Sequence, residues 1–155
     1  MLRRLRGDPR PYIVLVIAVA IIGAFFVVVA PLFATSGSAT ADLGGVLPTS
    51  AKLGQNLEVD VGYDNTSSAV IESTCVLVAT NGPLQVSSVT FQGLDVERVI
   101  NGKACGGSLN GQETISVRIV CVPTAAGMAS LSITPANGNT AVGAGLAGRI
   151  TIAPS

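Results

Sequence analysis

The most apolar stretch of the chain lies near its beginning, where residues 12–34 contain no charged side chain. An α-helix over these 23 residues would be about 34 Å long, enough to cross a hydrocarbon core of roughly 30 Å. The pattern therefore predicts one transmembrane helix over residues 12–34 in contact with the lipid bilayer. The small and polar residues 35–42 then predict a flexible linker.

From residue 43 onward the pattern changes to an alternation of apolar and polar positions. Residues 57–61 and 114–121 alternate strictly, as expected of strands with one buried and one solvated face. Runs rich in β-branched residues predict further strands over 69–80, 85–91, 94–100, 129–134 and 146–153. No sustained helical period appears past residue 42, so the region is predicted to be all-β.

Four Asn-Gly pairs separate these runs, and Asn-Gly is the strongest short hairpin signal because both residues tolerate positive φ. They are Asn81-Gly82, Asn101-Gly102, Asn110-Gly111 and Asn137-Gly138. Seven to nine short strands in some 110 residues are typical of a sandwich. We therefore predict a two-sheet antiparallel sandwich, of jelly-roll or immunoglobulin-like type, over residues 43–155.

Charge on either side of the apolar run predicts its orientation. Arg3, Arg4, Arg6 and Arg10 precede the run with Asp8 as the one opposing charge, and no Lys or Arg follows until Lys52. By the positive-inside rule these four arginines determine the topology. Residues 1–11 are then a cytoplasmic tail and the sandwich is extracytoplasmic. The alternative is a signal peptide cleaved following Ala41, after which the sandwich would be secreted.

Composition excludes several classes of function. The chain has 155 residues, no His and no Trp, and it is 48% hydrophobic but only 12% charged. Without His there is no Ser-His-Asp triad and no His-based zinc site. The residues after the apolar run carry a net charge of −3, whereas a nucleic-acid-binding domain presents a basic face. We predict no enzymatic activity, no catalytic residues, no cofactor and no nucleic-acid partner.

The order of the strands resembles that of cohesin-like modules of bacterial surface proteins. The resemblance rests on LEVDVGYDN at 57–65, CVLVATNGPLQVSSV at 75–89, ISVRIVCVPTAAGMASLSI at 115–133 and GRITIA at 148–153. It implies a nine-stranded jelly-roll sandwich used for protein–protein or surface attachment without catalysis. This chain departs from the family pattern in two places. The strand that usually carries Phe and Tyr has Cys75 and Ala79 instead, and the middle segment at residues 104–111 is short and Gly-rich. A dockerin-binding face therefore does not carry over residue by residue.

The three cysteines are candidates for a disulfide, because an exported domain is oxidised. Cys75 and Cys121 occupy apolar positions of their strands, whereas Cys105 lies in a loop-like, accessible segment. Three pairings are open. The cohesin-like order implies that the strand of Cys75 lies next to both the strand of Cys121 and the segment of Cys105. We therefore expect a disulfide that uses Cys75, with its partner left open.

The acidic residues of the region predict no metal site. Glu58 and Asp60 share the polar side of one strand and Asp64 follows, but the oxygen-rich loop of a calcium site is missing. We interpret these acids as a solvated strand face. Asn65-Thr66-Ser67 matches the N-glycosylation pattern. Tyr63 and Phe91 are expected in the core, which disfavours carbohydrate binding because no aromatic stacking surface remains.

These observations favour a non-enzymatic, membrane-anchored module for cell-surface adhesion or scaffolding that binds another protein on the extracytoplasmic side. One alternative is a single-pass accessory subunit of a membrane protein complex. A second alternative is a carbohydrate-binding module.

Overall fold

The computed structural model describes residues 38–92 and 99–155. These belong to one compact unit, Gly37–Ser155. The predicted cytoplasmic tail with its four arginines, the predicted transmembrane helix and the first three residues of the predicted linker lie outside the described residues, as does most of the predicted strand at 94–100. Within the two described ranges, no helix is long and apolar enough to cross a membrane.

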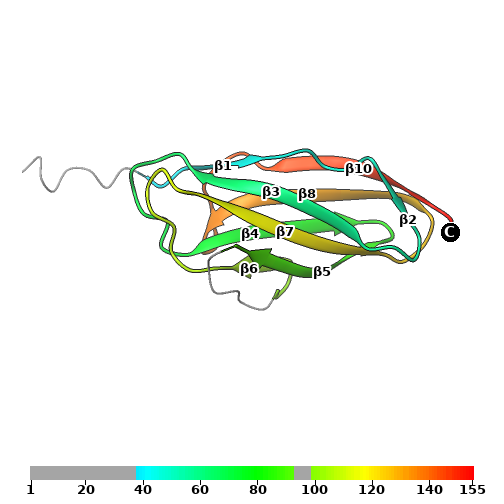
Figure 1. Cartoon of the computed structure of the whole chain (residues 1–155). Helices are drawn as coiled ribbons and strands as arrows, with labels where there is room; N and C mark the ends of the chain where they lie inside the picture. Colours follow the sequence, from blue (N-terminus) through cyan, green and yellow to red (C-terminus); the bar gives the residue numbers. More distant parts are fainter. Residues whose placement is uncertain (1–37, 93–98) are drawn as a thin grey trace, which may run out of the picture. The chain divides into compact units, whose positions relative to one another are not determined.

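The first layer of the fold is a four-stranded sheet, which we call sheet A. Its strands are β1 (Ala41–Gly44), β3 (Leu57–Asn65), β7 (Thr114–Pro123) and β5 (Leu84–Phe91), in the order β1-β3-β7-β5. All three neighbouring pairs are antiparallel. Figure 1 shows this sheet on the near side of the molecule.

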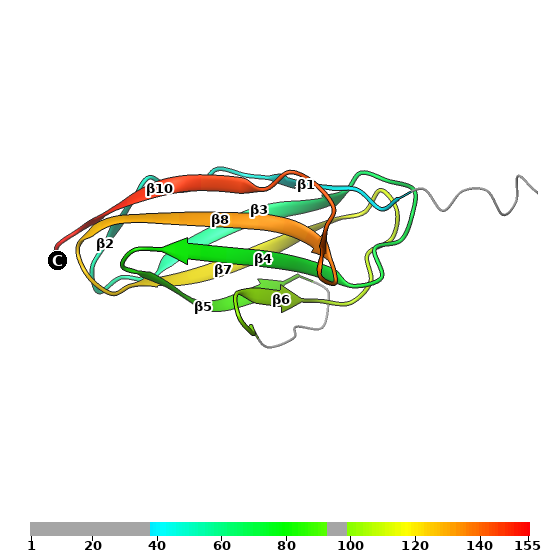
Figure 2. The same ribbon diagram turned by 180° about the vertical axis from the view of Figure 1, so that it is seen from behind.

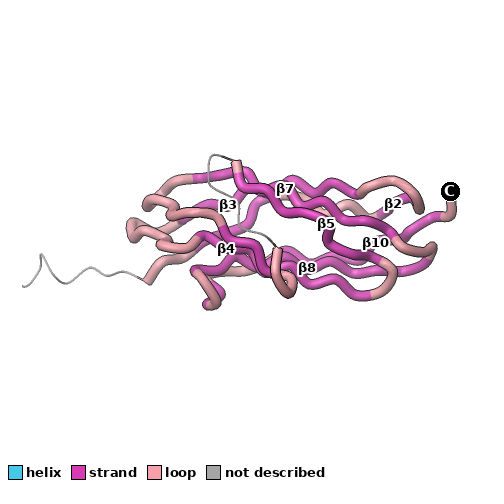
Figure 3. The backbone as a smooth tube through the Cα atoms, turned by 90° about the horizontal axis from the view of Figure 1, so that it is seen from below, coloured by secondary structure: helices cyan, strands magenta, loops and turns pink. Residues whose placement is uncertain are grey.

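The second layer, sheet B, has six strands and faces the viewer in Figure 2. Its order is β2 (Ser50–Lys52), β10 (Leu146–Ala153), β8 (Gly127–Asn137), β4 (Thr74–Asn81) and β6 (Lys103–Cys105), and β9 (Thr140–Ala141) pairs with β8. Seen edge-on, the two sheets form the two layers of a sandwich (Figure 3). The predicted all-β sandwich is confirmed for the described residues.

One strand pair departs from the predicted antiparallel pattern. After β1 in sheet A, the chain crosses to sheet B, where β2 pairs with β10 in parallel. Because β2 continues in the direction of β1 without a reversing hairpin, it meets the last strand of the chain in the same direction. The parallel pair is thus a result of one N-terminal segment serving both sheets.

The predicted strands at 57–61, 85–91, 114–121, 129–134 and 146–153 each lie within an observed strand. The strand predicted at 69–80 begins only at Thr74, because the preceding residues form a loop whose Ile71 makes an isolated bridge to Leu109. Strand β1 starts at Ala41, so the last two residues of the predicted linker belong to the sheet. Four residues are too few for their alternation to be read from sequence.

The core between the sheets consists of aliphatic side chains and two aromatic ones. As predicted, Tyr63 and Phe91 are buried, with 0% and 2% of their surface exposed. Alternation along β3 buries Leu57, Val59 and Val61, and equivalent positions of β7 and β8 complete the interior. The side chains at the intervening positions of β3 face solvent, and this places the polar residues described below.

The Asn-Gly pairs serve three different purposes. Asn101-Gly102 and Asn137-Gly138 form tight turns with positive φ at Asn101, Gly102 and Gly138. Asn81-Gly82, in contrast, connects β4 in sheet B to β5 in sheet A, and so joins the layers instead of forming a hairpin. At Asn110-Gly111 the glycine is required by close approach, because a Cβ on Gly111 would lie 2.5 Å from the Ser68 carbonyl oxygen.

Candidate functional site

The outward side of sheet A carries most of the carboxylates of the described structure. The alternation that buries Val59 and Val61 turns their neighbours on β3 toward solvent, and the same phase applies on β1 and β7. We call this surface the acidic face and define it by Asp42, Glu58, Asp60, Asp64 and Arg118. Four carboxylates and one guanidinium give it a net charge of −3.

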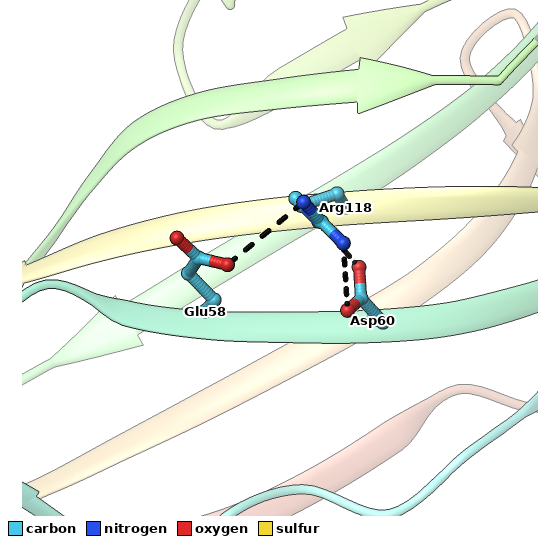
Figure 4. A network of polar contacts seen from close by, with 3 residues as sticks. All are labelled: Glu58, Asp60 and Arg118. Carbon is cyan, nitrogen blue, oxygen red and sulfur yellow. Dashed lines mark hydrogen bonds and ion pairs between the residues drawn. The ribbon is translucent and has the colours of Figure 1, made fainter.

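Arg118 lies at the centre of this face and binds two of its acids. It is the register partner of Asp60 across the β3–β7 pair. Its Nε donates to Oδ1 of Asp60 at 2.7 Å, and its Nη2 donates to Oδ2 at 3.2 Å. On its other side, Nη1 lies 3.9 Å from Oε2 of Glu58 (Figure 4). The fork geometry of the guanidinium therefore holds two carboxylates in fixed positions.

These contacts influence the protonation of the pair. The hydrogen bond from Arg118, helped by its positive charge, holds the pKa of the Asp60 carboxyl below its ordinary value of 3.8. The same hydrogen bond raises the pKa of Arg118 above its ordinary value. All three side chains are more than half exposed. Neither Glu58 nor Asp60 is therefore a desolvated carboxyl group of the kind that acts as a general acid near neutral pH.

A shallow hollow of about 450 Å³ lies beside this ion pair. Its lining is formed by Asp60, Thr90, Gln92, Ser116 and Arg118. Hydroxyl, amide and charged groups thus converge on one patch of a rigid sheet. Such a surface can form hydrogen bonds and ion pairs with a polar partner, and it holds no nucleophile paired with a base.

Two further acids at one end of the face have no compensating arginine opposite them. Asp42 on β1 and Asp64 on β3 are register partners, so two carboxylates lie directly across from each other. Like charges in this position destabilise a sheet. Asp64 accepts a hydrogen bond of 3.0 Å from Oγ1 of Thr114, which leaves both negative charges in place.

Neither a metal centre nor a sugar-stacking surface is formed by the described residues. Within 38–92 and 99–155, no three His, Cys, Asp or Glu side chains converge on a point that could hold a metal ion. Tyr63 and Phe91, the aromatic residues of these ranges, lie in the core. This part of the chain consequently offers no exposed aromatic ring against which a sugar could stack.

The cysteines occupy two different sheets. Cys75 on β4 and Cys105 on β6 are register partners in sheet B and form a disulfide. Cys121 is a buried thiol on β7 of sheet A, where desolvation raises its pKa to about 11. The expectation that the strands of Cys75 and Cys121 are neighbours was wrong, because β4 belongs to sheet B whereas β7 lies between β3 and β5 in sheet A. Cys105 was expected to be accessible, but it is only 4% exposed because β6 pairs with β4.

Asn65 has a structural role that its sequence motif did not indicate. Its side chain is fully buried, and Nδ2 donates to the carbonyl oxygens of Ala69, Leu109 and Asn110 at 2.8–3.3 Å. Its Oδ1 accepts from the backbone N–H and the hydroxyl of Ser67. Since the amide is enclosed and fully used, Asn65 cannot accept a glycan in the folded protein.

No protein-family model and no curated protein sequence matches this chain. Among solved structures, a cohesin module of a family 33 glycoside hydrolase from Clostridium perfringens superimposes with a TM-score of 0.54 and 13% identity, over 76% of this chain and 100% of the module. The CARDB domain of a Pyrococcus furiosus protein, in complex with di-metal ions, gives 0.51 and 21% over 75% and 88%. A family 123 glycoside hydrolase from C. perfringens gives 0.50 and 8% over 76% of this chain but only 28% of the enzyme.

These similarities define a class of fold. The described region is a cohesin-like β-sandwich, similar in architecture to cohesin modules and CARDB domains. At 8–21% identity the likeness concerns the arrangement of strands. It assigns no functional residue to this chain.

Proposed function

We propose that this chain is a non-enzymatic, membrane-anchored module for adhesion or scaffolding that binds another protein through the acidic face of sheet A. The central observation is the set of exposed polar groups around Arg118, which is fixed on a rigid sheet beside a shallow hollow. Protein interfaces use such charged, geometrically fixed surfaces to gain specificity. The similarity in fold to a cohesin module is in keeping with a binding role.

The absence of enzymatic activity is part of the same proposal. The chain contains no His, and the carboxylates of the acidic face are solvated or paired with Arg118. The thiol of Cys121 is buried and its pKa is raised, so it is not a reactive nucleophile at neutral pH. The described residues therefore support binding better than chemistry.

The start of the sandwich favours a retained anchor over cleavage following Ala41. Ala41 is 1% exposed, donates its N–H to the carbonyl oxygen of Val142 and pairs with Asn65 in the sheet. Thr40 accepts the backbone N–H of Thr66. Cleavage at that point would remove both residues from the folded edge of sheet A. We therefore propose that residues 12–34 remain as a transmembrane anchor, with the four arginines in the cytoplasm and the sandwich outside.

A photo-cross-linking experiment tests the binding proposal. A photoreactive residue replaces Thr90 or Ser116 beside the hollow in the full-length chain, and a matched control carries it at the exposed loop residue Glu72. Irradiation of intact cells is expected to give one discrete protein adduct from the two face positions and not from the control. Equal labelling from all three positions, or no adduct, would contradict the proposal.

Two further measurements test the anchor. The intact mass of the protein from the membrane fraction should include the first 41 residues. A protease added outside intact cells should cut the linker and release the folded sandwich from the membrane fraction, whereas a secreted protein would not be found in that fraction. A mature protein that begins at Asp42 would refute the anchor and leave the binding proposal standing.

A further inference from the structure

The outward side of sheet B differs in charge from the acidic face. Its strands β2, β4, β6, β8, β9 and β10 contain no Asp or Glu, and they carry Lys52, Lys103 and Arg149. We call this surface the basic face and define it by these three residues. Its net charge is +3, equal in size and opposite in sign to that of the acidic face on the other layer.

Several small side chains lie on the surface between these cations. Ala79, Ser130, Ser132 and Ala147 lie at outward positions of neighbouring strands, as the register of β4, β8 and β10 shows. Arg149 lines two shallow hollows, of about 310 and 470 Å³, on either side of it. Met128, which is 59% exposed, lines the smaller of these hollows together with Arg149, so an approaching surface would meet an apolar side chain beside the guanidinium.

The acidic face has the complementary requirement. Arg118 is shared between Asp60 and Glu58, and its Nη1 lies as far as 3.9 Å from Oε2 of Glu58. The opposed carboxylates of Asp42 and Asp64 have no cation of the described structure within ion-pair distance. A partner that supplies positive charge would relieve the repulsion between these carboxylates. The basic face of an identical molecule has that charge.

We propose that the acidic face of one molecule docks on the basic face of a second copy of this chain. This inference rests on the proposed function, because it names a second copy as the partner of the acidic face. The two surfaces lie on opposite sides of one sandwich, so the contact is heterologous and leaves one face of each kind unused. Such contacts propagate into rows instead of closing into a dimer. Copies anchored in one membrane with the same orientation could form such a row by translation alone.

The test uses the purified unit of residues 37–155, which contains the whole described core and is compact by itself. Sedimentation velocity at about 50 mM salt should show mass increasing with protein concentration, and about 500 mM salt should suppress it. Because the contact is open-ended, species larger than dimers are expected. A monomer at every concentration up to about 1 mM would overturn the proposal.

A charge-swap experiment identifies the faces. The basic-face variant Lys103→Glu/Arg149→Glu and the acidic-face variant Asp42→Lys/Asp64→Lys should each associate at least about tenfold more weakly than the unmodified unit. An equimolar mixture of the two should associate again, because each reversed face then meets a complementary one. The loop variant Glu72→Lys is the matched control and should behave like the unmodified unit. Association that persists in both variants, or a mixture that stays monomeric, would refute the assignment of faces.

The outcome for this inference is separable from that for the proposed function. If the purified unit does not self-associate but Thr90 and Ser116 still cross-link to a different protein in cells, self-docking is wrong and the binding role stands. If the cross-linked adduct is the chain itself, both are supported. Thermal unfolding of each variant, monitored by circular dichroism, confirms that a loss of association is not a loss of folding.

Discussion

The hydroxyl of Tyr63 crosses the core from sheet A and donates a hydrogen bond of 3.1 Å to the carbonyl oxygen of Ala136 in sheet B. Ala136 is the register partner of Cys75 on β4, and Cys75 is in turn bonded to Cys105. A single buried hydrogen bond therefore connects β3, which carries three acids of the acidic face, to the strands of sheet B that hold the Cys75–Cys105 disulfide. The relative position of the two sheets is therefore fixed by a directional hydrogen bond as well as by apolar packing.

The substitution Tyr63→Phe is expected to lower the free energy of unfolding by about 1 kcal/mol, because it removes this buried hydrogen bond and keeps the ring. Desolvation on burial raises the pKa of the Tyr63 hydroxyl to about 12 from 10.0. The folded state therefore favours the neutral phenol. This stabilisation is complete below pH 10 and is lost as the pH rises through about 12. Urea denaturation between pH 8 and 12 measures both effects.

The Cys121 thiol is the necessary control for this experiment, since its pKa rises from 9.0 to about 11 on burial. The contribution of the neutral thiol to the free energy of unfolding is lost over a lower range of pH than that of Tyr63, as the pH rises from 9 to about 11. Tyr63→Phe should remove only the upper part of the alkaline loss of stability, and Cys121→Ala only the lower part. An alkaline limb that is unchanged in the Tyr63→Phe variant would contradict the role assigned to the phenol.

The disulfide is expected to stabilise the fold by about 3–4 kcal/mol, because it closes a loop of 30 residues in the unfolded chain. The variant Cys75→Ala/Cys105→Ala should lose this amount in urea denaturation and should not respond further to reductant. Cys121→Ala keeps the disulfide, so its stability should still fall by a similar amount when reductant is added. Thiol titration gives an independent check. The folded protein should react slowly or not at all, the unfolded oxidised protein should show one thiol, and the unfolded reduced protein three. Three reactive thiols in the unreduced protein would refute the pairing.

The alternation of apolar and polar residues predicted the strands, because a strand of a sandwich has one buried side and one solvated side. The alternation at 57–61 correctly placed Glu58 and Asp60 on a solvated face and Val59 in the core. The same alternation cannot indicate which strands are neighbours, since that depends on contacts between distant segments. The neighbours of the Cys75 strand were therefore taken from the cohesin-like order, which placed the strand of Cys121 beside it, although the two strands belong to different sheets.

The candidate site was only half predicted for the same reason. The alternating pattern identified the acids of β3 but indicated no role for Arg118, which lies 58 residues from Asp60 and becomes its partner only through the β3–β7 register. The polar phase of Thr114, Ser116 and Arg118 placed the arginine on a solvated side, but not opposite a particular acid. Likewise, the motif at Asn65 gave no indication that this side chain would be enclosed by the loop at Ala69 and Leu109.

Replacement of Asn65 by Ala should destabilise the sandwich by about 2–4 kcal/mol, because three carbonyl oxygens and two donors of Ser67 lose their partner in a buried setting. Asn65→Asp should also be destabilising, since a carboxylate accepts but cannot donate to the three carbonyls. The exposed Asn56 provides the matched control, and Asn56→Ala should leave the denaturation midpoint nearly unchanged. Similar midpoints for the two alanine variants would contradict the role given to Asn65.

Removal of the guanidinium by Arg118→Met should release the Asp60 carboxyl from its partner and raise its pKa toward the ordinary value of 3.8, because the hydrogen bond from Arg118 is the main cause of the lowered pKa. Since the pKa of Asp60 is lower in the folded state, the pair stabilises the fold above pH 3.8 and ceases to do so as the pH falls through the folded pKa. The residues are exposed, so the effect on the melting temperature at neutral pH should be small. A carbon-detected NMR titration of the Asp60 carboxyl group measures the change directly. Arg149→Met on the opposite face is the matched control and should leave the titration of Asp60 unaltered; equal titration curves for both variants would show that Arg118 does not hold this carboxylate in solution.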